Sequence, residues 1–301
     1  MNKPSNTRAL HFLLILAAVH KGVDGKRCFV RWQDAVSLTD IDYATQRMLP
    51  AVSHHLDSRP LSRQVHKLVK FSRLRSQTFL EAAFRAETLL LVSNIPVAWV
   101  GGAAVLALTQ ASVSTRSLED VGLLVQSGFA EEATKILKLA GFQIETHSKP
   151  PGPVINKKRS DSALIFRDLS GAPVVLHFRI FDKILKPSAE KILWARVAKR
   201  VLLGREVNTI SPEDLFLQSI SSGVGGNQAI WVVDAIRLLE SKTIDLRTAS
   251  RLSIQNKLWL RLQISLLRIA RYKPDLVPMV YRYLAPPFSL LDFYLSRLVK
   301  S

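Results

Sequence analysis

The stretch 97–125 constrains the fold of this chain more than any other part of the sequence. The apolar run Val97–Val100 leads into Gly101-Gly102, and the apolar segment Ala103–Gln110 follows at once. A second apolar run, Val121–Val125, comes ten residues later. Short apolar runs bounded by glycine are typical of buried strands, and glycine alone adopts positive φ without strain. The stretch therefore predicts a strand, a tight turn, a short helix and a second strand.

The glycine pair also favours phosphate binding. Without side chains, the backbone amides of Gly101 and Gly102 can approach an anion closely, and the following helix directs its positive end at the same place. The alternative is a tight turn that needs positive φ whether or not phosphate binds. Both interpretations place the turn at the beginning of an α/β unit.

The rest of the middle third completes that unit. Apolar spacing predicts a helix from Phe129 that ends at Gly141, and alternation predicts two strands, Ala163–Arg167 and Val174–Ile180. We expect an α+β fold in which helices pack on a small mixed sheet. The expected division is an N-terminal helical region (1–92), an α/β core (93–185) and a C-terminal helical region (186–301).

The flanking regions show helical periodicity. Residues 59–74 and 77–92 predict two helices, and Ser211-Pro212-Glu213-Asp214 is a helix start with acids near its positive end. Further helices are expected at 228–240 and 254–272. The helix predicted over 59–74 carries cations at three- and four-residue steps. Such a stripe is usually a solvated face, and contact with a polyanion is the minority interpretation. These cations are Arg59, Arg63, Lys67, Lys70 and Arg73.

The charge balance indicates the kind of partner. Lysine and arginine total 42 against 24 acidic residues, a formal net charge of +18, which favours nucleotides, nucleic acid or other polyanions. Greater solubility alone is the competing explanation. Cys28 is the only cysteine and Ala9–Val19 is too short to span a bilayer, so we expect a cytoplasmic protein without a membrane span.

The ordered set Gly101-Gly102, Arg116 and Asp120 resembles the polymerase-β-type nucleotidyltransferase superfamily. More narrowly, it is similar to the bacterial "uncharacterised nucleotidyltransferase" families. The resemblance implies a bound NTP, Mg²⁺ ions and transfer of a nucleotidyl group. It implies that Asp120 is the first metal-binding and catalytic carboxylate, and that Gly101, Gly102 and Arg116 contact the nucleotide. Lys157 and Lys158, in a predicted loop, are further candidate phosphate contacts; a solvated charge run is the alternative.

The chain departs from the family pattern at three positions. Gly122 stands where the family has its second metal carboxylate, and Val175 stands where it has the third. Val100 replaces the lysine that often precedes the glycine. The adjacent Glu119 should point to the opposite face of the strand from Asp120. Two further acids, Asp168 and Asp182, could serve only through a rearranged geometry.

Three functions remain open on the sequence. The first is a family member that binds a nucleotide or polyanion with compromised or absent transfer. The second is an active transferase with atypical metal ligation that modifies a hydroxyl of a protein, RNA or small molecule. The third is a basic nucleic-acid-binding or partner-binding protein that uses the fold as a scaffold. Arg116 and Asp120 can alternatively form a salt bridge that pins the strand, and His177 is expected to be a structural histidine.

Overall fold

The structure, a computed structural model, describes residues 7–38, 41–56, 62–145, 162–181, 187–223 and 229–276. Its N-terminal part is helical, as the sequence predicts. The helices are α1 (Thr7–Val19), α2 (Gly22–Ala35), α3 (Tyr43–His55) and α4 (Arg63–Val92). The apolar segment of the first helix is buried against its neighbours. Among the described residues, no helix combines the length and apolar character needed to cross a membrane.

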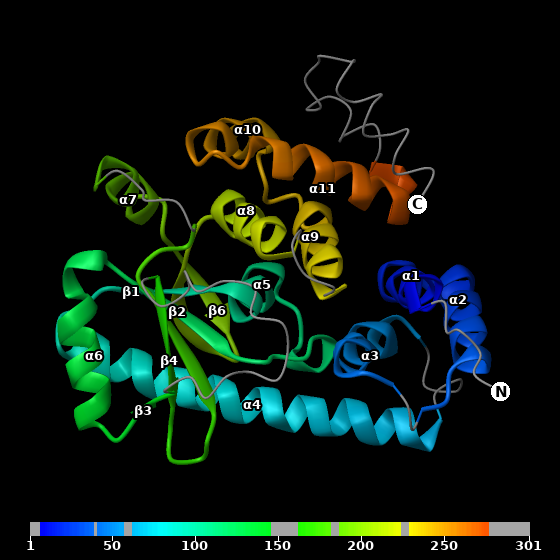
Figure 1. Ribbon diagram of the computed structural model, residues 1–301, viewed down its shortest axis with the longest axis horizontal. Helices are drawn as coiled ribbons and strands as arrows, with labels where there is room; N and C mark the ends of the chain where they lie inside the picture. Colours follow the sequence, from blue (N-terminus) through cyan, green and yellow to red (C-terminus); the bar gives the residue numbers. More distant parts are fainter. Residues whose placement is uncertain are drawn as a thin grey trace.

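One long helix replaces the two helices that the sequence predicts between 59 and 92. The α4 helix has 30 residues, and the Ser62 Oγ accepts a hydrogen bond from the Val65 amide at its start. The expected break lies near Ser76. A serine does not interrupt a helix when its hydroxyl bonds to a partner outside the helix. Ser76 is buried, and its Oγ accepts from the Leu118 amide at 3.0 Å. In Figure 1 this helix runs along one side of the whole sheet.

The sheet is mixed and has seven strands in the order β3-β4-β5-β2-β1-β7-β6. The β1–β2, β3–β4, β4–β5 and β6–β7 pairs are antiparallel, whereas β2–β5 and β1–β7 are parallel. The α+β class is confirmed. The strands are β1 (Val97–Val100), β2 (Val121–Val125), β3 (Gln143–Ile144), β4 (Ala163–Arg167), β5 (Pro173–His177), β6 (Ala198–Leu202) and β7 (Arg205–Thr209).

Two helices are joined to the central strands. The helix α5 (Gly101–Thr109) follows β1 directly, and α6 (Ala130–Leu139) follows β2. One face of β1 packs on α4: the Trp99 ring lies 4.8 Å from the Phe84 ring, and the Trp99 Nε1 donates to the Glu87 Oε1 at 2.6 Å. Burial raises the pKa of Glu87 even though this hydrogen bond and Arg205 act to lower it. Residues on the other face of β1 and β2 therefore line the candidate site.

The hairpin β6–β7 was not expected, and it extends the sheet beyond residue 185. Its connection is Leu203-Gly204, with φ of 51° and 76°. Two consecutive positive φ values are typical of a type I′ hairpin turn, which is usually signalled by Asn-Gly or Asp-Gly. The two strands are rich in charge and half exposed, so their apolar alternation is weak.

The C-terminal part is helical and covers the sheet on the side away from α4 (Figure 1). Its helices are α7 (Pro187–Trp194), α8 (Pro212–Gly223), α9 (Ile230–Glu240), α10 (Leu246–Gln255) and α11 (Trp259–Tyr272). The start at Ser211 is confirmed, because its Oγ accepts from the Asp214 amide. The helix predicted over 254–272 is interrupted at Lys257, whose φ is 56°.

The end of α3 makes stability depend on pH. Burial is the largest cause that lowers the pKa of His55 from 6.5 to about 4, and the nearby cations His54, Arg237, Lys21 and Lys273 add to it. Between pH 6.5 and about 4 the unfolded chain therefore binds more protons at His55 than the folded protein does, and the free energy of unfolding falls as pH drops through that window.

We expect His55→Gln to remove this contribution. Between pH 7 and pH 4.5 the variant should lose about 1 kcal/mol less unfolding free energy than the parent, a value discounted for the exposed part of the ring. Urea titrations at the two pH values measure it. Equal losses of unfolding free energy in the parent and the variant would contradict the assignment of this pH dependence to His55.

Candidate active site

The Gly101-Gly102 turn begins α5 directly at the end of β1. Gly101 has a φ of 64°, so this position needs the freedom of glycine. Its amide donates a hydrogen bond to the Gln218 Oε1 of α8 at 2.9 Å. A side-chain oxygen thus already satisfies one of the amides that the sequence predicts for phosphate binding.

The Arg116 side chain packs against the glycine turn at Gly102. A Cβ added at Gly102 would lie 2.0 Å from the Arg116 Nη1, so the guanidinium group packs against the bare backbone of that glycine. Its partner is Asp234 of α9: the Nε donates to Oδ1 at 2.9 Å and the Nη2 to Oδ2 at 2.7 Å. Exposed fractions are 7% for Arg116 and 4% for Asp234.

This pairing replaces the Arg116–Asp120 salt bridge that the sequence left open, and that alternative was wrong. Burial acts to lower the pKa of Arg116, but the attraction and hydrogen bonds of Asp234 outweigh it and raise the pKa. Arg116 also donates from Nη1 to the Ser117 carbonyl at 3.1 Å. These contacts fix the loop that leads to Asp120.

Asp120 and Glu119 have different surroundings. Asp120 is exposed directly before β2, and it takes part in none of the ion pairs among the described residues. The Glu119 Oε1 lies 2.7 Å from the Nη1 of the buried Arg47 on α3. Burial raises the pKa of Glu119 and lowers that of Arg47, and in each case it outweighs the attraction of the other.

The space above Gly122 is already filled. Gly122 pairs with Val100 on one side and Val175 on the other, so these positions share a face of the sheet. A Cβ added at Gly122 would lie 2.6 Å from the Val100 Cγ2 and 3.1 Å from the His177 Nε2. An added side chain would therefore force Val100 to shift and would press against the His177 ring.

The donor set does not fit a two-metal site. Such a site needs carboxylates that clamp two ions about 4 Å apart. No group of three or more histidine, cysteine, aspartate or glutamate side chains suitable for a metal occurs in the described ranges. Asp168 is held by Arg85 of α4 and accepts hydrogen bonds from Ser170 and Ala172. The sequence candidates Lys157, Lys158 and Asp182 lie outside the described residues.

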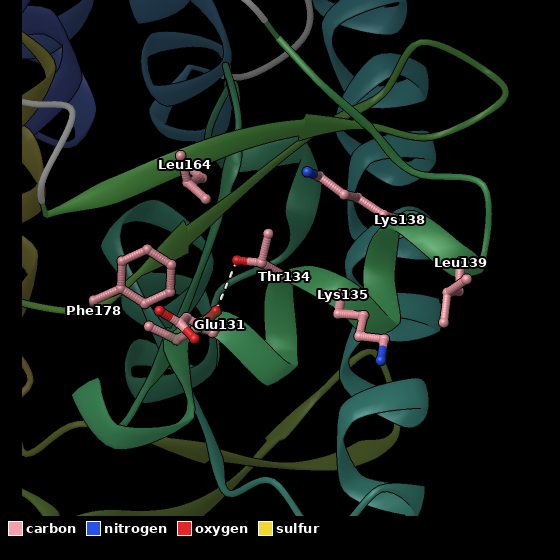
Figure 2. A pocket seen from close by; sticks show the side chains of 8 residues that line it. Glu131, Thr134, Lys135, Lys138, Leu139, Leu164 and Phe178 are labelled. Carbon is pink, nitrogen blue, oxygen red and sulfur yellow. Dashed lines mark hydrogen bonds between the residues drawn. The ribbon is translucent and has the colours of Figure 1, made fainter.

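A groove lies elsewhere, between α6 and the β4–β5 hairpin. It is an open, mostly apolar groove of about 590 Å³ that none of the candidate site residues lines. Figure 2 shows Leu164 and Phe178 on one side of it and the α6 residues Thr134 and Lys138 on the other. The groove therefore gives no support to chemistry at the glycine turn.

The strand, glycine turn, helix and acid-led strand lie together within a mixed α+β sheet. Residues 32–272 match the family described as "Uncharacterised nucleotidyltransferase". The chain belongs to this family. No curated protein sequence matches it.

The chain is similar to several solved structures. A lincosamide antibiotic adenylyltransferase with lincomycin bound is 14% identical, with a TM-score of 0.39, and the match covers 54% of this chain and 96% of that one. The antibiotic-resistance factor ANT(2'')-Ia is 13% identical, with a TM-score of 0.40 and coverages of 69% and 98%. An antigenic nucleotidyltransferase-like protein from Paracoccidioides brasiliensis is 16% identical, with a TM-score of 0.41 and coverages of 69% and 92%.

Proposed function

We propose that this nucleotidyltransferase-family protein binds a nucleotide at the Gly101-Gly102 turn and has lost most or all nucleotidyl transfer. The filled space above Gly122 carries the proposal. Val100 and His177 occupy the position where the family's second carboxylate would project, so the change at Gly122 is accompanied by packing that closes the gap. Val175 leaves the neighbouring strand without an acid as well.

Nucleotide binding is supported by the features that remain at the turn. Gly101 keeps its positive φ, α5 begins there with its positive end, and no acid lies in the first turn of that helix. The Gln218 oxygen occupies the Gly101 amide, and a phosphate oxygen would take its place when a nucleotide binds. Arg116 contributes by holding the Gly102 backbone in place, while Lys157 and Lys158 remain candidate phosphate contacts.

The proposal predicts ATP or GTP binding that is nearly the same in magnesium and in EDTA. Gln218→Glu keeps the oxygen that accepts from Gly101 and adds a negative charge beside the phosphates. At about 4 Å such a charge should weaken binding about tenfold or more. Isothermal titration calorimetry with both nucleotides measures the change.

The matched control is Gln143→Glu, the same substitution at an exposed position on β3. It should leave the dissociation constant unchanged. Absence of binding with or without magnesium would overturn the proposal, and equal weakening by both variants would place the nucleotide elsewhere.

Transfer distinguishes this proposal from an active transferase. Incubation of the protein with each α-³²P-NTP and cell lysate should give no labelled acceptor above the level of Asp120→Asn. Label that depends on magnesium and disappears in Asp120→Asn would instead establish a working enzyme with atypical ligation. The variant suits the test because Asp120 is exposed, so its exchange leaves the packing intact.

A further inference from the structure

A second surface, made by α3 and the N-terminal half of α4, carries features that the glycine turn does not explain. We call it the α3–α4 face and define it by Tyr43, Arg47, Phe71, Ser72 and Arg75. The two helices pack side by side (Figure 1). All five residues line one small recess of about 30 Å³.

Three residues that line the recess carry buried donors without acceptors. The Arg47 Nε, the Ser72 Oγ and the Arg75 Nε are each buried, and each lacks a hydrogen-bond partner among the described residues. Leaving such a group unpaired typically costs a folded protein stability. Three such donors on residues that line one recess favour the binding of an oxygen-rich ligand there.

The ligand that fits these donors is an oxyanion. Two of the three groups belong to guanidinium side chains, which bind phosphate and carboxylate oxygens through their N–H groups. Glu119 Oε1 lies 2.7 Å from the Arg47 Nη1, and burial still lowers the pKa of this arginine. A volume of about 30 Å³ holds about two waters, so one edge of a phosphate can enter while the rest stays at the mouth.

Aromatic rings flank the recess. The Arg75 guanidinium lies 5.3 Å from the Tyr43 ring centre and 6.0 Å from that of Phe71, and its Nη2 donates to the Tyr43 hydroxyl at 2.8 Å. Phe71 is 63% exposed and Tyr43 is 46% exposed. Exposed rings beside this recess offer flat surfaces to nucleobases.

Cations continue the face along α4. No acid occurs between Ser62 and Leu80, and the basic side chains of this half of the helix are exposed. They are Arg63, Lys67, Lys70 and Arg73. Their three- and four-residue spacing keeps them beside Phe71 on the solvent side. The sequence predicts this row of cations, and the structure places the Phe71 and Tyr43 rings and the recess beside it.

We propose that the α3–α4 face binds single-stranded nucleic acid. A backbone phosphate sits at the recess of Arg47, Ser72 and Arg75, neighbouring bases stack on Phe71 and Tyr43, and the α4 cations follow the chain. Bases in a duplex are already stacked on one another and cannot lie on these rings. The proposal uses residues remote from Gly101 in sequence and does not rest on nucleotide binding there.

Fluorescence anisotropy with labelled 12-nucleotide single strands, in RNA and DNA form, tests the proposal. Three variants separate its parts. Phe71→Ala should weaken binding about tenfold through lost stacking. Lys67→Gln with Lys70→Gln should lower the slope of log affinity against log salt by about 1.4. Ser72→Ala should weaken binding about threefold without lowering stability, because its hydroxyl is unpaired in the free protein.

Matched controls lie on α6. Leu139→Ala, at an exposed apolar position, and Lys135→Gln with Lys138→Gln, at the same spacing, should leave affinity and salt slope unchanged. Equal affinity for a blunt duplex, or binding unaffected by Phe71→Ala, would overturn the proposal. Binding to vesicles containing phosphatidylserine without binding to either oligonucleotide would overturn it as well and assign the face to a lipid surface.

Discussion

Replacing Arg116 by methionine is expected to lower the free energy of unfolding by about 3–5 kcal/mol, because the change leaves the Asp234 carboxylate buried without a partner. Asp234 is 4% exposed and receives hydrogen bonds from both the Nε and the Nη2 of Arg116. Guanidinium chloride denaturation followed by circular dichroism measures the loss.

The double variant Arg116→Met with Asp234→Leu is the control. It removes both charges, so most of the stability should return, as is common when apolar residues replace a buried ion pair. A single variant that loses less than about 1 kcal/mol would contradict the assignment of Arg116 as a buried support of the turn. The expected loss also makes Arg116→Ala unsuitable as a test of nucleotide contact.

Gly122→Asp is expected to lower the free energy of unfolding by about 3 kcal/mol or more, although it restores the family's residue. Overpacking against Val100 and His177 should account for about 1–3 kcal/mol, and the desolvation of a buried carboxylate adds to it. Thermal and denaturant unfolding measure the effect. The same variant should show no magnesium-dependent gain in nucleotide affinity, because Val175 still leaves the third position apolar.

Two further variants separate the causes. Gly122→Ala adds the Cβ without the charge, and its cost should fall when Val100→Ala is also present, since that change removes the Cγ2 that lies 2.6 Å from the added atom. Additive effects of the two changes would contradict the packing explanation. A stable Gly122→Asp protein would contradict it more directly.

The elements with strong local signals were predictable. The strands Val97–Val100 and Val121–Val125 have the bounds that the sequence predicts, since each is a continuous buried run between proline, glycine or polar residues. The β6–β7 hairpin was not predictable, because Leu203 in the left-handed region is not a recognised turn signal. The break between α10 and α11 was not predictable for the same reason, because it lies at Lys257, a residue that seldom adopts positive φ.

The candidate site was predictable only in its local parts. The sequence indicates the glycine turn and the missing acid at Gly122, but the contacts that decide their meaning join distant segments. Asp234 is 118 positions from Arg116, and Gln218 is 117 positions from Gly101. Neither residue had a local pattern that would mark it, although Asp234 lies in the helix predicted over 228–240.

The long helix α4 has a consequence for the evolutionary history of such chains. Its Ser76 holds the Leu118 amide, and its Glu87 holds the Trp99 indole. The two positions are about three helical turns apart, so both side chains face the sheet. Insertion or deletion of one residue between them would rotate one contact away by about 100°. Related chains should therefore vary in loop length yet keep this interval constant, which makes it a fixed mark for aligning distant members.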